Sequence, residues 1–229
     1  MEKISKTLDI LAEYFNYTER TTLNRMRNPE KISSEKNKDF LEKPNAFKIL
    51  IACLLSLRTR DDTTESVSEK LFKIADTPEA ISKIPLKKLE KIIYSSGHYK
   101  KKAKTLKYVS RELINKFNGK VPNVKEDLLS IKGIGPKTAN IVLNFAYQQP
   151  TLPIDTHCHR IPNRLGWIKT KTPEQTEIAL EKILPKKYWK EFNAIFVLFG
   201  KTICQPVSPL CNQCPVNKYC EKIGVTSNR

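Results

Sequence analysis

The sequence lacks any long hydrophobic run, which argues against a helix that crosses a membrane. No apolar stretch approaches the ~20 residues that span a bilayer. Segment 1–15, MEKISKTLDILAEYF, spreads its charges in an amphipathic helical pattern and lacks the unbroken apolar core of a signal peptide. We therefore expect a cytoplasmic protein with no membrane partner. In that reducing compartment, disulfide bonds are the weaker explanation for the six cysteines.

Strand signals are missing as well, because no segment alternates apolar and polar residues, and no internal repeat is present. Helical signals are frequent. Thr77 and Thr172 each precede a Pro-Glu pair, which is typical of a helix start. Segments 86–95 and 99–117 have helical spacing, and segment 47–57 is apolar on almost every side, as in a buried central helix. These patterns predict an all-α fold.

Acidic residues are fewer than basic ones. The chain has 24 Asp and Glu and 41 Lys and Arg, which gives a formal net charge of +17. A lysine-rich surface can serve solubility or heat resistance alone. The excess is clustered, however, since the segment from Lys87 to Lys116 holds ten basic and two acidic residues. Such a cluster favours a partner with many phosphates, because each neutralised phosphate releases counterions. We therefore predict a nucleic-acid partner.

Four of the six cysteines lie within 17 residues in the pattern C-x6-C-x2-C-x5-C: Cys204, Cys211, Cys214 and Cys220. Thiolates this dense in a proline-rich segment must face a common centre. A 4Fe–4S cluster and a zinc ion both take four cysteine thiolates. Zinc usually prefers two well-separated C-x2-C pairs, and this segment has only one, which favours the cluster. Cys53 and Cys158 lie elsewhere and are expected to be buried thiols.

The segment DLLSIKGIGPKTANIVLNFAY, residues 127–147, has the pattern of a helix–hairpin–helix. A first helix ends before a turn from Lys132 to Gly135, and Pro136 opens a second helix. Gly133 and Gly135 are expected to adopt backbone conformations closed to other residues. They leave N–H groups bare beside the positive end of the second helix. That arrangement suits a DNA phosphate bound without sequence readout.

Two further residues carry the candidate chemistry. Lys137 is the second residue of the new helix, where the helix dipole and Lys132 disfavour the ammonium form and help to produce a nucleophilic amine. A second phosphate contact is the alternative role. Asp155 follows 18 residues later, within the segment PIDTH. Capping a helix is its simplest role, and a capping carboxylate held by N–H groups also stays anionic beside a developing positive charge.

Three motifs in order, the hairpin IKGIGPKTAN, the segment PIDTH and the terminal cysteine pattern, resemble the endonuclease III family of helix–hairpin–helix DNA glycosylases. The likeness extends from about Phe47 to Cys220. It implies that Lys137 is the nucleophile and Asp155 the catalytic aspartate. Relatives that only excise bases carry Ser or Tyr at this lysine's place. Lys137 therefore favours a bifunctional glycosylase and abasic-site lyase.

The resemblance implies a base excision repair enzyme that acts on damaged double-stranded DNA. It removes oxidised or reduced pyrimidines through a Schiff base on Lys137 and then cuts the strand by β-elimination. One alternative is a mismatch glycosylase of the same superfamily, which acts on uracil or thymine opposite guanine. The other is a non-enzymatic iron–sulfur DNA-binding protein, and the pair of Lys137 and Asp155 argues against it.

The sequence departs from the family pattern in its DNA-contacting loops. Arg58 stands where bacterial relatives carry the glutamine that fills the gap left by the flipped nucleotide. A guanidinium can stack on an orphaned base or hydrogen-bond to it. His98 stands at the usually apolar wedge position, and the cysteine loop 205–210 has no basic residue. Phosphate binding is therefore assigned to three other places: Lys132, Lys201 and the helix that carries residues 100–107.

We expect two helical lobes with a DNA-binding cleft between them. Residues 40–150 are predicted to form a six-helix lobe that contains the hairpin. Residues 1–39 and 151–229 are predicted to form the lobe with the 4Fe–4S cluster. The polar segment 17–45 is expected to be a loop. We expect a monomer that works on the nucleoid of a prokaryotic or archaeal cell.

Overall fold

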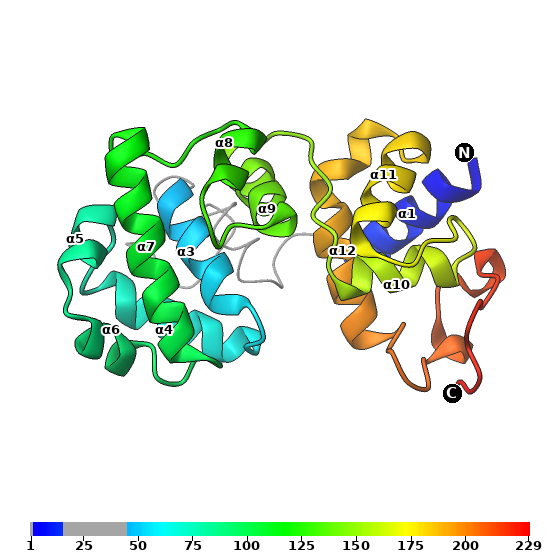
Figure 1. Cartoon of the computed structure of the whole chain (residues 1–229). Coiled ribbons are helices and arrows are strands. Elements are labelled where there is room, and N and C mark those ends of the chain that lie inside the picture. The colour runs from blue at the N-terminus through cyan, green and yellow to red at the C-terminus, as the bar shows by residue number, and fades with distance from the viewer. Residues whose placement is uncertain (1, 16–44) are drawn as a thin grey trace. The chain divides into compact units, whose positions relative to one another are not determined.

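The computed structural model describes residues 2–15 and 45–229, and every regular element within them is helical (Figure 1). The all-α prediction is confirmed. Segment 17–45, expected to be a loop, lies outside the described residues except for Asn45. The α-helices are α1 (Glu2–Tyr14), α3 (Ala46–Ser56), α4 (Asp61–Phe72), α5 (Pro78–Lys83), α6 (Leu86–Ile92), α7 (Tyr99–Phe117), α8 (Lys125–Ser130), α9 (Pro136–Tyr147), α10 (Thr156–Arg164), α11 (Pro173–Ile183) and α12 (Trp189–Thr202). The short 3-10 helices are η3 (Lys186–Tyr188), η4 (Cys211–Gln213) and η5 (Asn217–Tyr219).

The chain divides into two compact units. One unit comprises residues 25–148, and the other comprises residues 1–24 together with 149–229. The hairpin and Lys137 belong to the first unit, whereas Asp155 and the four clustered cysteines belong to the second. The expected boundary between residues 39 and 40 lies outside the described residues. Among the described residues, no helix has the length and apolar character that a membrane crossing requires.

Helix α3 forms the core of the unit 25–148. Asn45 begins it, and the side-chain Oδ1 of Asn45 accepts hydrogen bonds from the N–H groups of Phe47 and Lys48 at 3.0 and 3.1 Å. Every residue from Ile49 to Leu55 is buried, and α3 packs against α9, α4 and α7. The expectation of a buried central helix is confirmed. Its packing against α9 places the hairpin on the core of this unit.

Helix α7 has the predicted bounds, 99–117, and ends in left-handed backbone at Asn118 and Gly119, with φ of 52° and 73°. Its apolar face packs against α5 and α6. Thr77 caps α5 as expected, because its hydroxyl accepts a hydrogen bond from the N–H group of Ala80 at 3.2 Å. The start of α7 therefore lies beside α6 and the segment 93–98 that joins the two helices.

The second unit is centred on α12, which buries an aromatic face. Phe192, Phe196 and Phe199 are all buried, and the rings of the first two stack with centroids 4.2 Å apart. Leu8 and Leu11 of α1 join the same core, which accounts for the amphipathic pattern of that segment. Helix α10 packs against α12 and α11. The aromatic core therefore holds α10, the helix that Asp155 precedes.

Candidate functional site

The hairpin joins α8 to α9 by a turn that requires glycine at one position. Ile131 and Ile134 are buried and anchor the turn, whereas Lys132 is exposed. Gly133 has a φ of 103°, and a Cβ there would lie 2.9 Å from the side-chain Cγ2 of Thr105. A larger residue would therefore be strained at this position whatever its side chain.

Gly135 differs from the expectation. Its φ of −98° and ψ of 174° are extended backbone that any residue adopts, so the prediction of a special conformation is wrong there. No atom lies within 4 Å of a Cβ built on Gly135, and its lack of a side chain leaves α9 without a side-chain cap. Pro136 has no N–H, and no side chain of the N-cap residue bonds to the first-turn N–H groups of Lys137 and Thr138. This end of α9 is suited to an anion.

Lys137 lies half-buried in the first turn of α9, beside α3. The buried thiol of Cys53 on α3 is close enough to sense its charge. Burial raises the pKa of Cys53, while the charge of Lys137 and a 3.8 Å contact with the hydroxyl of Thr138 oppose that rise. Asn140 and Asn144, which the sequence places on the same helical face, are buried. They therefore belong to the interior of the unit.

Asp155 caps α10, as expected. Its Oδ1 accepts hydrogen bonds from the N–H groups of His157 and Cys158 at 2.9 and 2.8 Å. No hydrogen bond occupies its Oδ2 within the part of the chain that the structure describes. The carboxylate is thus oriented through Oδ1 alone.

Glycine also shapes the surroundings of Asp155. A Cβ on Gly200 of α12 would lie 2.1 Å from the ring Nδ1 of His157, so only glycine allows α12 to pack this close to α10. Arg160 of α10 donates to the ring of His157 at 3.2 Å and to the carbonyl oxygen of Cys204 at 2.7 Å. Lys201, the predicted phosphate ligand, follows Gly200 and is exposed.

The four clustered cysteines line one pocket of the second unit. All four are free thiols, and the apolar side chains of Phe199, Leu210 and Val225 line the same pocket. Burial, opposed by a backbone hydrogen bond from Val216 and assisted by the other three thiols of the cluster, raises the pKa of Cys214 to about 11. The four sulfurs are therefore close neighbours in an apolar setting. A positively charged iron centre would stabilise them as thiolates, so the donor set fits a 4Fe–4S cluster.

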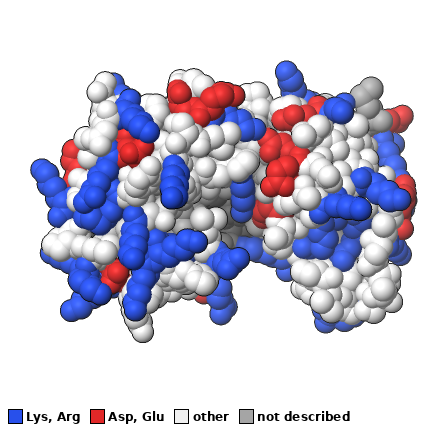
Figure 2. Space-filling model, viewed as in Figure 1, with Lys and Arg blue, Asp and Glu red and all other residues white. Residues whose placement is uncertain are grey.

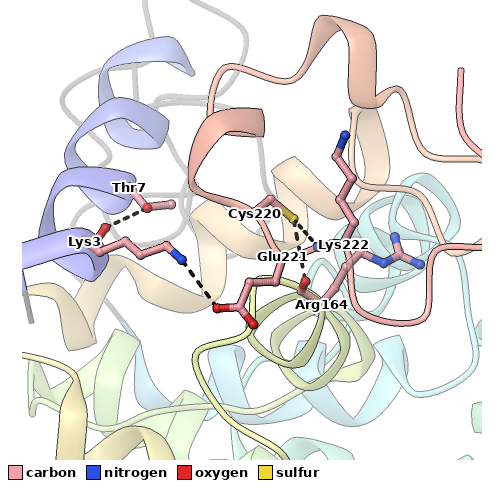
Figure 3. Close-up of polar contacts among 6 residues, drawn as sticks. All are labelled: Lys3, Thr7, Arg164, Cys220, Glu221 and Lys222. Carbon is pink, nitrogen blue, oxygen red and sulfur yellow. Dashed lines mark hydrogen bonds and ion pairs between the residues drawn. The ribbon is translucent and has the colours of Figure 1, made fainter.

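Protein groups also contact these sulfurs. Arg164 of α10 donates from Nη1 to the Sγ of Cys204 at 3.4 Å, and its carbonyl oxygen accepts from the Sγ of Cys220 at 3.6 Å. The backbone N–H of Lys222 donates to the Sγ of Cys220 at 3.3 Å (Figure 3). Next to it, Glu221 lies 3.5 Å from the Nζ of Lys3 on α1. The cysteine segment is thus tied both to α10 and to the N-terminal helix.

Two exposed loops of the unit 25–148 meet through their backbones. Arg58 follows α3 and His98 precedes α7, and both have left-handed backbone, with φ of 53° and 57°. A Cβ on Gly97 would lie 2.6 Å from the carbonyl oxygen of Arg58, so only glycine allows the loops to come this close. The structure brings the candidate gap filler and the candidate wedge into neighbouring loops. Their contacts with DNA stay predictions.

The basic helix α7 requires a correction, because two of its lysines bond to the protein. Lys102 is only 7% exposed. The Nζ of Lys107 donates to the carbonyl oxygens of Ser82, at 2.7 Å, and of Ile84. Lys and Arg side chains still gather over the face on which α6 and α7 lie (Figure 2). The exposed lysines of segment 100–107 are Lys100, Lys101 and Lys104.

Comparison with known proteins gives a consistent result. The sequence matches the family described as HhH-GPD superfamily base excision DNA repair protein over residues 51–186. It is 47% identical to the endonuclease III of Thermotoga maritima over 175 residues, which is 76% of this chain and 82% of that protein. A solved endonuclease III trapped as a covalent intermediate with DNA is similar at a TM-score of 0.81 and 31% identity, over 96% of this chain and 95% of that chain. A thermostable thymine-DNA glycosylase, 23% identical, is similar in fold alone at a TM-score of 0.80 over 96% of both chains.

Proposed function

This chain belongs to the endonuclease III family of helix–hairpin–helix base excision repair proteins, and we propose that it acts through Lys137 and Asp155 on oxidised or reduced pyrimidines in DNA. As a member of that family it is a DNA glycosylase and abasic-site lyase. The observation that carries the residue assignment is the uncapped N-terminus of α9, which has Lys137 in its first turn. Borohydride trapping of the enzyme on a thymine glycol duplex tests it.

The reaction begins when a damaged nucleotide turns out of the duplex, at a cost of a few kcal/mol that is smallest for damaged pairs. The first-turn N–H groups of α9 hold a backbone phosphate. The Nζ of Lys137 then attacks C1′ of the sugar, and the base leaves with the bonding electrons. The C1′–O4′ bond of the sugar then opens as the amine proton passes to O4′, and the Schiff base that forms between C1′ and Lys137 makes the C2′ hydrogens acidic. Removal of one of them expels the 3′ phosphate by β-elimination and cuts the strand.

Asp155 serves this reaction as the catalytic carboxylate. Its Oδ1 is held by the N–H groups of His157 and Cys158. Its Oδ2 takes the proton from the amine of Lys137 and stabilises positive charge on the sugar. Helix capping and catalysis therefore use different oxygens of one side chain.

Replacing Asp155 with Asn separates these two roles. Asn caps helices as well as Asp does, so α10 should remain folded. The amide cannot accept the proton, and we expect single-turnover release of thymine glycol to fall by roughly 10²-fold or more. Circular dichroism melting of the variant controls for the cap. An unchanged release rate would remove Asp155 from the chemistry.

The four cysteines, Cys204, Cys211, Cys214 and Cys220, hold a 4Fe–4S cluster in this proposal. The shared apolar pocket and the mutual influence of the thiols support it. The cluster supplies a structural crosslink that fastens the C-terminal segment to α10.

Phosphate contacts of the second unit are assigned to Lys201, which follows the close contact between Gly200 and His157. The cysteine loop 205–210 has no basic residue to share this role. We expect Lys201→Glu to weaken binding to an abasic-site duplex and to flatten its salt dependence by about one unit of log–log slope. Fluorescence anisotropy over a salt series measures both.

The matched control for this prediction is Lys182→Glu, an identical charge change on the exposed surface of α11. It should lower affinity much less and leave the salt slope near that of the wild type. Equal slopes for Lys201→Glu and the wild type would sink the assignment of Lys201.

The alternative function, a mismatch glycosylase, differs from the proposed one in the lesion that is excised. The likeness to a thymine-DNA glycosylase is a likeness of fold, and Lys137 stands where relatives that only excise bases carry Ser or Tyr. Family membership also favours an enzyme over a non-enzymatic DNA-binding protein. Excision assays on thymine glycol and on uracil or thymine opposite guanine distinguish the two lesion classes. Faster excision of the mismatched base would favour the alternative.

A further inference from the structure

A buried lysine outside the candidate catalytic pair joins the loop after α3 to the loop before α7. The Nζ of Lys102 donates three hydrogen bonds: to the carbonyl oxygen of Leu55 at 2.6 Å, the hydroxyl of Thr59 at 2.7 Å and the hydroxyl of Ser96 at 2.8 Å. An ammonium group has three N–H donors, so each has one acceptor here. In the described part of the chain, no ion pair with a carboxylate involves Lys102. Three neutral oxygens, one from the last turn of α3 and one from each loop, hold this amine.

The backbone around Lys102 extends the same network. Its N–H donates to the carbonyl oxygen of His98 at 3.1 Å. The hydroxyl of Thr59 accepts a hydrogen bond from the N–H of Gly97 at 3.0 Å and lies 3.3 Å from the hydroxyl of Ser96. Each loop is therefore bonded to Lys102 and to the other loop. Lys102 is the one residue of α7 whose side chain donates to the loop after α3 among the described contacts.

Burying a charged amine at this position costs free energy, and helix α7 could form without that amine. Burial lowers the pKa of Lys102 to about 8, which shows how unfavourable the interior is for its charge. An apolar residue would fill the same place without that cost. Lys101 and Lys104 on the same helix are exposed to solvent, so their charges are not buried. The buried amine is therefore expected to stabilise the two loops to which it donates hydrogen bonds.

Both loops hold strained backbone at their exposed tips. Arg58 and His98 are non-glycine residues with left-handed backbone, a conformation that persists only where surrounding contacts impose it. Contacts from Lys102 reach both loops at the residues next to these tips, Thr59 and Gly97, directly or through one hydroxyl. The network is thus placed to impose the two conformations together.

We propose that Lys102 is a positioning residue that holds the Arg58 loop (residues 57–60) and the His98 loop (residues 95–98) as one unit, so that both side chains enter a DNA duplex together. This inference rests on the proposed function, in which Arg58 fills the gap left by the flipped nucleotide and His98 wedges the stack. Lys102 itself stays inside the protein. It follows that Lys102 matters for duplex substrates, which have an opposite base and a stack to open, and not for single strands.

The test compares Lys102→Met with Lys83→Met, which removes the same charge from the exposed end of α5 in the same unit. We expect Lys102→Met to slow single-turnover excision of thymine glycol from a duplex by about tenfold to a hundredfold, the scale of a small misplacement at a reacting centre. Cleavage of an abasic site in a single-stranded oligonucleotide should stay within about twofold of the wild type, because it needs the catalytic pair and neither loop. Lys83→Met should change neither the duplex rate nor the single-strand rate.

A fluorescent base reports the loops directly. With 2-aminopurine opposite a stable abasic analogue, we expect the wild type and Lys83→Met to change the fluorescence on binding, and Lys102→Met to lose most of that change at saturating protein. Adding Lys102→Met to Arg58→Ala should slow duplex excision little further, since Lys102 acts through that loop. Gly97→Ala, which must push the loops apart, should resemble Lys102→Met. Thr59→Val gives a milder form of the same defect if Lys102→Met does not fold.

Several results would overturn the proposal. One is an equal loss of single-strand and duplex cleavage in Lys102→Met. Another is a Lys102→Met variant whose fluorescence change on binding equals that of the wild type. The third is a double variant in which the effects of Lys102→Met and Arg58→Ala on duplex excision add. Failure of the proposed function looks different, because the wild type itself would then form no borohydride adduct on either substrate. A wild type that traps normally, with a Lys102→Met variant that excises normally, rejects the positioning role alone.

Discussion

Lys137→Gln should abolish the covalent adduct that borohydride traps between the enzyme and a thymine glycol duplex. The adduct is a reduced Schiff base, and Gln has no amine with which to form it. Strand cleavage should fall by at least ~10³-fold, as expected when a nucleophile is removed. Binding to an uncleavable abasic analogue should persist, because the N–H groups at the start of α9 belong to the backbone. Gel analysis of trapped complexes and single-turnover cleavage measure both effects.

Lys132→Gln is the matched control, because it removes a lysine from the same hairpin at an exposed position before the turn. It should weaken binding and flatten the salt dependence, yet leave adduct formation intact at saturating enzyme. Base release without any adduct in the wild type would contradict the Schiff base. Lys137 would then be a phosphate contact and the enzyme a glycosylase only.

Removing one thiol of the cysteine cluster should unfold the C-terminal part of the second unit. Cys211→Ser would remove a buried ligand of the proposed cluster, and structural zinc sites supply about 10 kcal/mol of folding free energy. That is comparable with the whole stability of a domain, about 5–15 kcal/mol. We expect purified variant protein to lose its iron, its brown colour and its cooperative thermal transition. Iron analysis, visible absorbance and calorimetry detect these losses.

Cys158→Ala provides the control, since Cys158 is a fully buried thiol of α10 outside the pocket. It should keep its iron and lose only about 1 kcal/mol of stability, the effect of a small cavity. Iron retained in Cys211→Ser, or wild-type protein that is colourless and holds zinc, would contradict the cluster.

Local signals in the sequence were sufficient for the helices. Thr77 caps α5, α7 has the predicted bounds and residues 49–55 of the apolar segment are buried, because caps and apolar periodicity act over a few residues. The same reasoning erred at Gly135, whose extended backbone needs no glycine. Composition alone cannot tell a glycine that permits a left-handed turn from one that leaves space for a ligand.

The number of lysines in α7 was also an incomplete guide to which of them can bind phosphate. Lys102 and Lys107 read as phosphate ligands in the sequence, but both amines bond to backbone carbonyl oxygens of the protein. These carbonyl oxygens belong to residues 23 to 47 positions away, so no local pattern marks them. A buried lysine becomes recognisable only when the loops around it are folded.

The sequence by itself determined the helical fold, the hairpin with Lys137, the capping Asp155 and the four-cysteine pattern, because each depends on residue types at short, fixed spacings. Only the tertiary structure decided that the loops of Arg58 and His98 touch and that Lys102 joins them. It also decided that Oδ1 of Asp155 is committed to capping. These features depend on contacts between segments far apart in the chain, which packing creates and residue spacing does not encode.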